Sequence, residues 1–174
     1  TRRLEQQQAL LKAAQVVASE LRLETVLQRL VVEVTNLLDA DAADCYLLDE
    51  DGALLRCAAV NGLDAALVEF EFPADRGLAG EALRTGRSAA SNDYGDHEQP
   101  VPHPAYEGFT AAVVAPMAWS GEARGVLGAG TRDPERRFAP GDAELLETFA
   151  GLAGLAVRNA ASFEQSVRQA RIQR

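Results

Sequence analysis

Two apolar stretches that each turn back on themselves constrain the fold of this chain more than any other feature. Residues 43–48 and 54–60 flank the acidic turn DEDG, and residues 110–119 and 124–131 flank the turn SGEA. Apolar runs on both sides of a short turn that is rich in Asp, Gly or Ser are typical of a β-hairpin. Two hairpins of this kind predict an antiparallel sheet.

Helical patterns surround and connect the two hairpins. Residues 4–20 predict a first helix, the run VLQRLVVEVTNLLDA predicts a second that ends near residue 40, and a last helix is expected from Asp142 onward. Between the hairpins, LAGEALRT predicts a short helix and SAASND a short strand. This order of elements indicates an α+β fold, with an antiparallel sheet and helices mostly on one face.

The first and last helices each carry a narrow apolar seam with coiled-coil spacing. Both seams run to the ends of the sequence, and an isolated helix would leave them exposed to water. We therefore expect a parallel homodimer in which the terminal helices form a four-helix bundle. The residues predicted to contact the partner are Leu4, Leu11, Leu145, Phe149, Leu152, Ala156 and Phe163.

The overall charge and hydropathy exclude several classes of partner. The formal net charge of the 174 residues is −9, and such a field repels a phosphate backbone, so we expect no nucleic-acid binding. No apolar run approaches the ~18 residues that a membrane span needs, and no signal-peptide pattern opens the chain. These features predict a cytoplasmic protein without a membrane partner.

The chain has two cysteines, one in each strand of the first predicted hairpin. Counting back from the turn DEDG places Cys45 opposite Arg56, and Cys57 then points to the other face of the sheet. We therefore expect two free thiols, as is usual in a reducing compartment. Redox catalysis through Cys45 or Cys57 is the enzymatic alternative, but no histidine lies nearby in the sequence. The segment itself is not expected to be an enzyme.

The stretch GDHEQPVPHPAYEGF, residues 95–109, holds both histidines and three of the seven prolines. A proline pushes the preceding residue into an extended conformation, so this loop is expected to be stiff. Its aromatic residues and its stiffness are typical of a lid over a small-molecule pocket. Direct contact of a histidine with the ligand and ligation of haem iron by His103 remain open as alternatives. A structural zinc site is disfavoured, because cysteines at regular spacing are missing.

Two other patterns indicate possible sites. Asp39, Asp41 and Asp44 resemble part of an EF-hand calcium loop, but Asp44 stands where that loop needs glycine. The stretch RGLAG, residues 76–80, opens a helix, so its amides could receive a carboxylate or phosphate. It lacks the lysine of a phosphate-binding loop, and a tight turn at Gly77 explains it equally well.

Three stretches of the chain together resemble the GAF domain, a sensory module of bacterial signalling proteins. They are LRLETVLQRLVVEVTNLLDADAADCYLLDEDG, RGLAGEALRTGRSAASND and GEARGVLGAGTRDPERRFAPGDAELLETFAGLAGLAVRNAASFE. The third stretch is similar to the last hairpin of the family and to both the beginning and the end of the final helix. The resemblance covers about residues 21 to 164.

This resemblance implies a PAS-related, six-stranded antiparallel sheet with a ligand pocket on one face and long N- and C-terminal signalling helices. It divides the chain into a signalling helix at 1–22, the GAF domain at 23–160 and a helical extension at 161–174. That extension would lead to an output domain such as a kinase, cyclase or phosphatase, for example in a two-component system. The pocket is expected to be lined by Phe72, Leu78, Tyr94, His97, His103, Tyr106, Phe109 and Val113.

The implied function is that of a sensory domain that binds an unidentified small molecule and transmits its ligand state through a dimeric helical bundle. The resemblance leaves two alternatives. PHPAYEGF is similar to the His-Pro stretch of haem-binding GAF domains in oxygen-sensing kinases, although the Pro-Met pair that follows there is missing. A GAF fold can also serve as a ligand-free dimerisation spacer. The cysteines used for bilin attachment or for methionine sulfoxide reduction, and the cyclic-nucleotide signature, are missing from their expected places. No cofactor is predicted, and haem is the alternative.

Overall fold

The computed structural model describes residues 2–19, 22–119 and 121–172, and these form an α+β fold around one six-stranded sheet. Every neighbouring pair of strands is antiparallel, in the order β3-β2-β1-β6-β5-β4. The strands are β1 (Ala42–Leu48), β2 (Leu54–Asn61), β3 (Glu71–Pro73), β4 (Ala89–Ser91), β5 (Ala111–Trp119) and β6 (Glu122–Thr131). The predicted fold class is confirmed.

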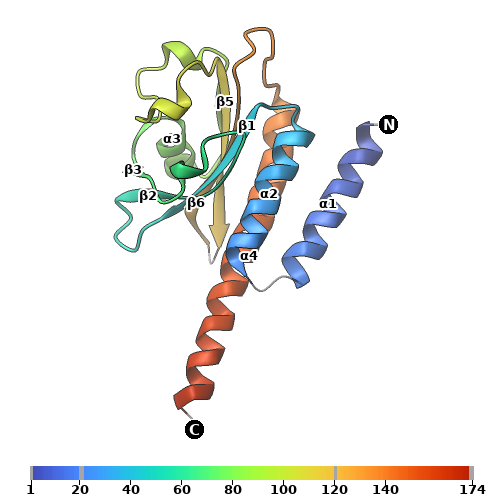
Figure 1. Cartoon of the computed structure of the whole chain (residues 1–174), viewed down its shortest axis with the longest axis vertical. Coiled ribbons are helices and arrows are strands. Elements are labelled where there is room, and N and C mark those ends of the chain that lie inside the picture. The colour runs from blue at the N-terminus through green and yellow to red at the C-terminus, as the bar shows by residue number, and fades with distance from the viewer. Residues whose placement is uncertain (1, 20–21, 120, 173–174) are drawn as a thin grey trace.

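The helices lie in layers on the two sides of this sheet (Figure 1). Helices α2 (Leu23–Leu37) and α4 (Pro140–Ile172) cover one face, and α1 (Arg2–Ser19) lies outside them and contacts both. Helix α3 (Gly77–Thr85) lies on the opposite face, together with 3-10 turns at Tyr94–Asp96 and Pro104–Tyr106. The C-terminal half of α4 projects beyond the sheet (Figure 1), so the expected long terminal helices are present. None of the described helices is long and apolar enough to cross a membrane.

Both predicted hairpins and all three long helices are confirmed, whereas strand β3 was missed. β3 is three residues long and pairs with β2 through Leu54 and Pro73, and a strand this short shows no alternation. A further 3-10 turn, at Ala65–Leu67, precedes it in the chain. The expected end of the first helix at residue 20 lies outside the described residues. The last helix begins at Pro140, and the Asp142 carboxylate accepts a hydrogen bond from the Ala139 amide, which caps this end.

The register of the first hairpin corrects the sequence-based expectation. Cys45 pairs with Ala59 and not with Arg56. The loop closes later than expected, because the Asp49 amide donates to the Leu54 carbonyl at 2.9 Å. A β-bulge directly after Cys45 then shifts the pairing further. The bulge re-aims the side chains of β2, and the two cysteines still lie on opposite faces of the sheet, as predicted.

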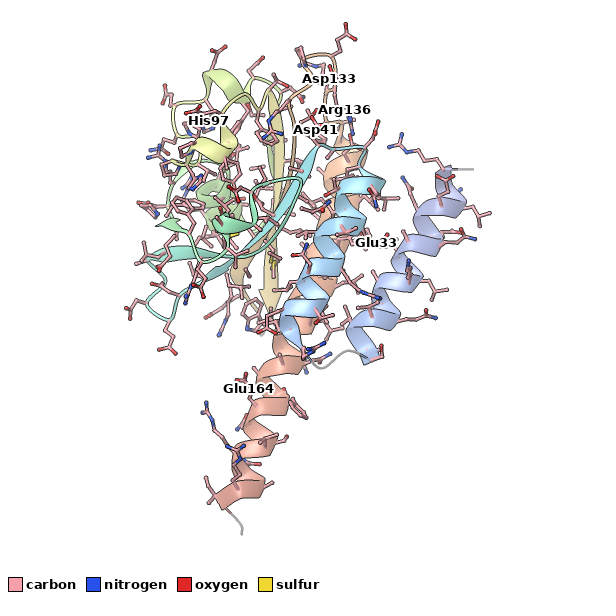
Figure 2. All side chains as sticks on the ribbon, in the orientation of Figure 1. Glu33, Asp41, His97, Asp133, Arg136 and Glu164 are labelled. Carbon is pink, nitrogen blue, oxygen red and sulfur yellow. The ribbon has the colours of Figure 1, made fainter. Side chains whose placement is uncertain are left out.

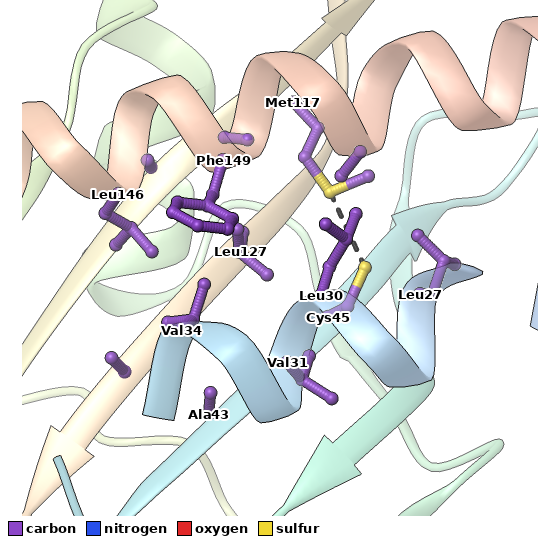
Figure 3. Close-up of a cluster of buried hydrophobic side chains, with 14 of the residues drawn as sticks. Leu27, Leu30, Val31, Val34, Ala43, Cys45, Met117, Leu127, Leu146 and Phe149 are labelled. Atoms are coloured by element: carbon purple, nitrogen blue, oxygen red, sulfur yellow. Dashed lines mark hydrogen bonds between the residues drawn. The ribbon is translucent and has the colours of Figure 1, made fainter. Parts of the chain in front are cut away.

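The main hydrophobic core lies between the sheet and the layer of α2 and α4 (Figure 3). The apolar stripe of α2 packs against α4 and the strands, as its spacing predicted. Helix α4 approaches β5 closely at Gly154, where an added Cβ would lie 2.5 Å from the Ala118 carbonyl oxygen. The largest side chains of this core include Leu27, Leu30, Val31, Met117, Leu127, Leu146 and Phe149.

Helix α1 turns a different face inward from the predicted seam. Its buried residues are Ala13 and Val17, and Leu10 packs partly against the same core. Leu4 and Leu11 of the predicted seam are 53% and 62% exposed. The predicted seam of α1 therefore does not form part of the core of this chain.

Two of the predicted dimer contacts in α4 are instead part of the domain's own core. Phe149 is 1% exposed and Ala156 is 5% exposed, and both pack among the core residues of this chain. Because α4 lies directly on the sheet, the apolar side chains of its first turns are buried against the sheet of the same chain. Leu145 and Leu152 are half-buried against the same core, and Phe163, on the projecting part of α4, is 46% exposed.

Candidate ligand-binding site

A cavity of about 60 Å³ lies on the face of the sheet opposite α2 and α4. Its floor is formed by β1, β5 and β6, one wall by α3, and its cover by the loop between β4 and β5. We call residues 95–109 of this loop the lid. The side chains that line the cavity are mostly apolar, with a few polar groups among them, as is usual for small-molecule sites.

Small residues on the central strands create the space above the floor. Asp44 in β1 is paired with Gly128 in β6, which is paired in turn with Val114 in β5. A Cβ added to Gly128 would lie 2.6 Å from Asp44 Oδ1, so only glycine leaves room for the carboxyl here. Ala112 and Gly130 form the next row of the floor.

Asp44 is the one acidic residue among the side chains that line the cavity. The Tyr106 hydroxyl donates to Asp44 Oδ2 at 2.7 Å, and the Tyr106 and Tyr46 hydroxyl oxygens lie 2.7 Å apart in a second hydrogen bond. Burial raises the pKa of Asp44 to about 6, although the hydrogen bond from Tyr106 lowers it. No ion pair that the structure shows among the described residues includes Asp44.

The sequence analysis missed Asp44 as a pocket residue and considered it only for calcium. A signal was present: Asp44 is a lone acid inside the apolar run AADCYLL, two residues from Tyr46 and therefore on the same face of the strand. A lone carboxyl on a buried face needs a hydrogen-bond donor or a ligand.

Three tyrosines around Asp44 stay protonated at neutral pH. Burial is the main cause that raises the pKa of Tyr46, Tyr94 and Tyr106, and the negative charge of Asp44 raises each further. Their hydroxyls therefore act as hydrogen-bond donors or acceptors, and not as anions. Tyr94 uses its hydroxyl to accept a hydrogen bond from the Val101 amide at 2.9 Å, which closes the first half of the lid.

The lid is fastened to the start of α3. Arg76 Nε donates to the Pro100 carbonyl at 2.8 Å, and the Gly77 amide donates to Gln99 Oε1 at 3.1 Å. The N-terminus of α3, which the sequence analysis considered as an anion site, is thus hydrogen-bonded to the Gln99 side chain of the lid. At the other end of the lid, the Arg132 guanidinium lies 4.2 Å from the centre of the Phe109 ring.

The two histidines shape the lid and do not line the cavity. His97 Nδ1 accepts a hydrogen bond from the Gln99 amide, and His103 Nδ1 accepts one from the Ala105 amide, each at 3.0 Å. The His97 ring stacks on Tyr94 with ring centres 5.8 Å apart. Figure 2 shows His97 on the side of the sheet away from α2 and α4. Both histidines therefore cap tight turns of the lid.

Of the eight side chains predicted for the pocket, five line the cavity and three do not. Val113 points into the core beneath α4, because its neighbour Val114 takes the cavity side of β5. His97 and His103 lie in the lid, outside the lining. The five that line the cavity are Phe72, Leu78, Tyr94, Tyr106 and Phe109, and their contact with a ligand remains a prediction.

The residues around His103 do not fit a haem group. The His103 ring packs edge-on against Phe70, with ring centres 4.8 Å apart, its Nδ1 accepts a hydrogen bond from the Ala105 amide, and it does not line the cavity. Metal ligands are also missing: the described part of the chain contains no cluster of three or more His, Cys, Asp or Glu side chains that could hold an ion. Asp41, considered for calcium, accepts hydrogen bonds from Thr131 Oγ1 and the Arg132 amide.

Neither cysteine has the environment of a catalytic thiol. Cys45 is fully buried with its Sγ 3.5 Å from Met117 Sδ, and Cys57 Sγ lies 3.8 Å from the Ala59 carbonyl oxygen. Burial, followed by the charge of Asp44, raises the pKa of Cys57 to about 12 and that of Cys45 further still. A thiol with so high a pKa has almost no thiolate at neutral pH, so it is a poor nucleophile.

Comparison with known proteins agrees with this architecture. The model of the GAF domain family matches residues 20–158 of the sequence. A search of curated proteins gave no significant match.

Several solved structures share the fold at low sequence identity. The GAF domain of a phosphoenolpyruvate-protein phosphotransferase from Coxiella burnetii has a TM-score of 0.83 at 21% identity, over 93% of this chain and 98% of that one. Free methionine-R-sulfoxide reductase from Neisseria meningitidis, in complex with its substrate, has a TM-score of 0.78 at 21% identity, over 90% of each chain. The phycoerythrobilin-bound GAF domain of a cyanobacterial phytochrome has a TM-score of 0.71 at 20% identity, over 91% of this chain and 97% of that one.

Proposed function

The chain belongs to the GAF domain family, whose members are sensory and regulatory modules, and we propose that it senses a small molecule bound in the cavity beneath the lid. The observation that carries this proposal is the cavity itself, with Asp44 at its floor and Tyr106 reaching down to it from the lid. An apolar space with a few convergent polar groups and one carboxyl of perturbed pKa is the usual form of a ligand site.

We propose that α4 transmits the ligand state. Gly128 of β6 lies at the cavity floor, and the next strand, β5, contacts α4 on its other face at Gly154. A change in the lid or the floor therefore reaches α4 through a single layer of sheet. The segments proposed for this task are a signalling helix at 1–22, the sensory domain at 23–160 and the extension at 161–174. An output domain would follow in the full-length protein of a bacterial signalling system, such as a two-component system in the cytoplasm.

We propose further that two copies associate through their terminal helices. Leu4 and Leu11 of α1 and Phe163, on the projecting part of α4, are large apolar side chains that are 53%, 62% and 46% exposed. Leu145 and Leu152 could contribute their exposed portions, whereas Phe149 and Ala156 are covered by their own chain. The segment itself would act by binding, since both thiols are buried and protonated.

A metabolite screen by thermal shift, followed by native mass spectrometry of the hits, tests the ligand site. We expect Gly128→Ala to abolish binding of a hit, because the new methyl group displaces the Asp44 carboxyl. Gly151→Ala is the matched control, since an added Cβ there meets no atom within 4 Å. Hits that bind equally well to both variants, or the lack of any hit, would contradict the proposal and favour a ligand-free spacer.

Analytical ultracentrifugation tests the association. We expect Leu11→Glu and Phe163→Glu to shift the protein from dimer to monomer, because each buries a charge in the proposed contact. Val68→Glu is the control. Val68 is 40% exposed like the predicted contact residues, but it lies next to the 3-10 turn that precedes β3 and not on a terminal helix. Wild-type protein that sediments as a monomer at a concentration on the order of tens of micromolar would refute the dimer.

A further inference from the structure

The Asp44 carboxyl is half-buried at the cavity floor, and none of the ion pairs shown among the described residues includes it. Its partners are the Tyr106 hydroxyl at Oδ2 and the close backbone of Gly128 near Oδ1. An ionised carboxylate in such a place is costly unless a cation or several donors compensate it. The structure shows one neutral donor, the Tyr106 hydroxyl, which leaves the negative charge uncompensated.

Apart from the tyrosine hydroxyls, the lining near Asp44 is mostly apolar. Phe72, Leu78, Val114 and Phe109 line the same cavity and would pack against a hydrophobic body. Arg76 is the one basic residue of the lining, and its Nε is bonded to the Pro100 carbonyl of the lid. The floor of the cavity therefore offers a negative charge surrounded by apolar surface.

Tyr106 occupies the position that a ligand would take on this carboxyl. It is carried by the lid turn Pro104–Tyr106, and its hydroxyl lies 2.7 Å from both Asp44 Oδ2 and the Tyr46 hydroxyl. The cavity measures only about 60 Å³ with Tyr106 in this position, which is room for little more than ordered water. An occupant that bonds to Asp44 Oδ2 therefore competes with this hydroxyl.

We propose that the cavity binds a small organic cation, an ammonium or amidinium group on an apolar body, which pairs with Asp44 and displaces the Tyr106 hydroxyl from it. This deepens the proposed sensory function and rests on it, since it names the chemical class of the ligand and the residue that the ligand moves. Displacement of Tyr106 loosens the second half of the lid and so couples the occupied carboxyl to the loop that covers it. Asp44 is the binding residue, and Tyr106 is the gate.

Charge-matched probes of one shape test this assignment: benzylammonium, benzyl alcohol and benzoate, titrated into ¹⁵N-labelled protein at physiological salt and pH 7.5. We expect benzylammonium to bind at least about tenfold more tightly than benzoate, because only the cation compensates the buried carboxylate. The amides of Gly128 and Tyr106 should shift together. If benzoate bound more tightly than benzylammonium, Arg76 and not Asp44 would be the residue that pairs with the charge of the ligand, and the proposal would be overturned.

Two variants separate the roles of the carboxyl and the gate. Asp44→Asn should remove the preference for benzylammonium, whereas Asp51→Asn, a change at an exposed acid of the β1–β2 loop, should keep it and so exclude simple attraction to an acidic protein. Tyr106→Phe removes the competing hydroxyl and should tighten benzylammonium binding several-fold. Unchanged affinity in Asp44→Asn, or weaker binding in Tyr106→Phe, would refute the pairing or the gate.

A measurement on the wild-type protein keeps the test independent of these variants. Because burial raises the pKa of Asp44 to about 6, its charge is lost on acidification, and benzylammonium affinity should fall about tenfold between pH 7.5 and pH 5. The thiols and tyrosine hydroxyls whose pKa values are raised in part by the charge of Asp44 stay protonated in this window, and they are Cys45, Tyr46, Cys57, Tyr94 and Tyr106. Arg76 is the basic side chain of the same lining. A flat profile would overturn the proposal. Neutral or anionic hits in the metabolite screen would leave the sensory function standing and refute only the cationic ligand.

Discussion

The side chains of β5 and β6 face two different environments in alternation. On the side of α2 and α4, Val113, Met117 and Leu127 are fully buried in a continuous apolar core (Figure 3). On the side of the lid, Val114 and Gly128 border a cavity that contains a carboxyl group. We call the side of the sheet that packs against α2 and α4 the filled face and the side that borders the cavity the hollow face. Consecutive residues of the same strands belong to one face and then to the other.

The difference shows where stability and function are separated in this domain. The filled face buries large side chains and no titratable group other than a protonated thiol, so it stabilises the fold. The hollow face keeps an acidic group at a raised pKa and fills its floor with glycine and alanine. We expect substitutions on the first face to destabilise the protein, and some substitutions on the second to stabilise it while removing binding.

The largest effect is expected from Phe149→Ala on the filled face. Phe149 is 1% exposed and packs between α2 and the sheet, so its truncation leaves a cavity and should lower the free energy of unfolding by about 3–5 kcal/mol. Urea denaturation followed by circular dichroism measures this. Phe163→Ala, on the exposed part of α4, is the control and should change the monomer by less than about 0.5 kcal/mol. Equal losses of unfolding free energy in Phe149→Ala and Phe163→Ala would contradict the distinction between the core part and the projecting part of α4.

Asp44→Asn on the hollow face should act in the opposite direction at neutral pH. The pKa of Asp44 rises from 3.8 to about 6 on folding, so between these values the folded protein holds a proton that the unfolded chain has released. The free energy of unfolding therefore falls as the pH rises through this window. An amide avoids that loss, and at pH 7.5 we expect a gain of about 1–2 kcal/mol, below the ~3 kcal/mol of the full shift because the carboxyl retains some surface facing the cavity.

The same comparison at low pH provides the control for Asp44. At pH 4, well below the folded pKa of about 6 and close to the unfolded value of 3.8, the charge of Asp44 contributes little to the free energy of unfolding, so wild-type and Asp44→Asn proteins should unfold at nearly the same urea concentration. A stabilisation that is equal at pH 4 and pH 7.5 would mean that packing, and not charge, causes it.

Substitution of the two cysteines compares the cost of a polar group on the two faces directly. Cys45→Ser places a hydroxyl beside the Met117 sulfur on the filled face and should cost about 1–2 kcal/mol. Cys57→Ser on the hollow face retains the Ala59 carbonyl as an acceptor and should cost less than about 1 kcal/mol. Chemical denaturation gives both values. Ellman labelling should also be slow for both thiols until the protein unfolds, and fast labelling of native Cys57 would revive the redox hypothesis.

The smallest effect is expected at His103 in the lid. His103→Ala removes the acceptor for the Ala105 amide and should cost about 0.5–1 kcal/mol, whereas His103→Asn keeps an acceptor at the same place and should cost less. Thermal unfolding of the two variants checks this order. A Soret band in haem-reconstituted wild-type protein that disappears in His103→Asn would instead establish the histidine as an iron ligand.

The elements could be predicted because their signals are local. The stripe of α2 repeats within a few residues, and both hairpins flank short turns. The family resemblance added the sixth strand, which the residues of β3 do not reveal. The register of the first hairpin was wrong because it depends on which residues of the turn close the loop and on a bulge after Cys45. Those details depend on tertiary packing as well as on local preference.

The amino-acid sequence was enough to predict the fold class, the aromatic residues of the lid and the apolar character of the terminal helices, since each follows from side-chain spacing along one element. The contacts that these side chains make depend on tertiary packing. It buried Phe149 within the chain, turned His97 and His103 into caps of the lid, and brought Tyr106 to Asp44 across 62 positions of sequence. The physical reason is that periodicity sets which face of an element is apolar, whereas a buried charge acquires its partner and its pKa from residues that only the folded chain brings together.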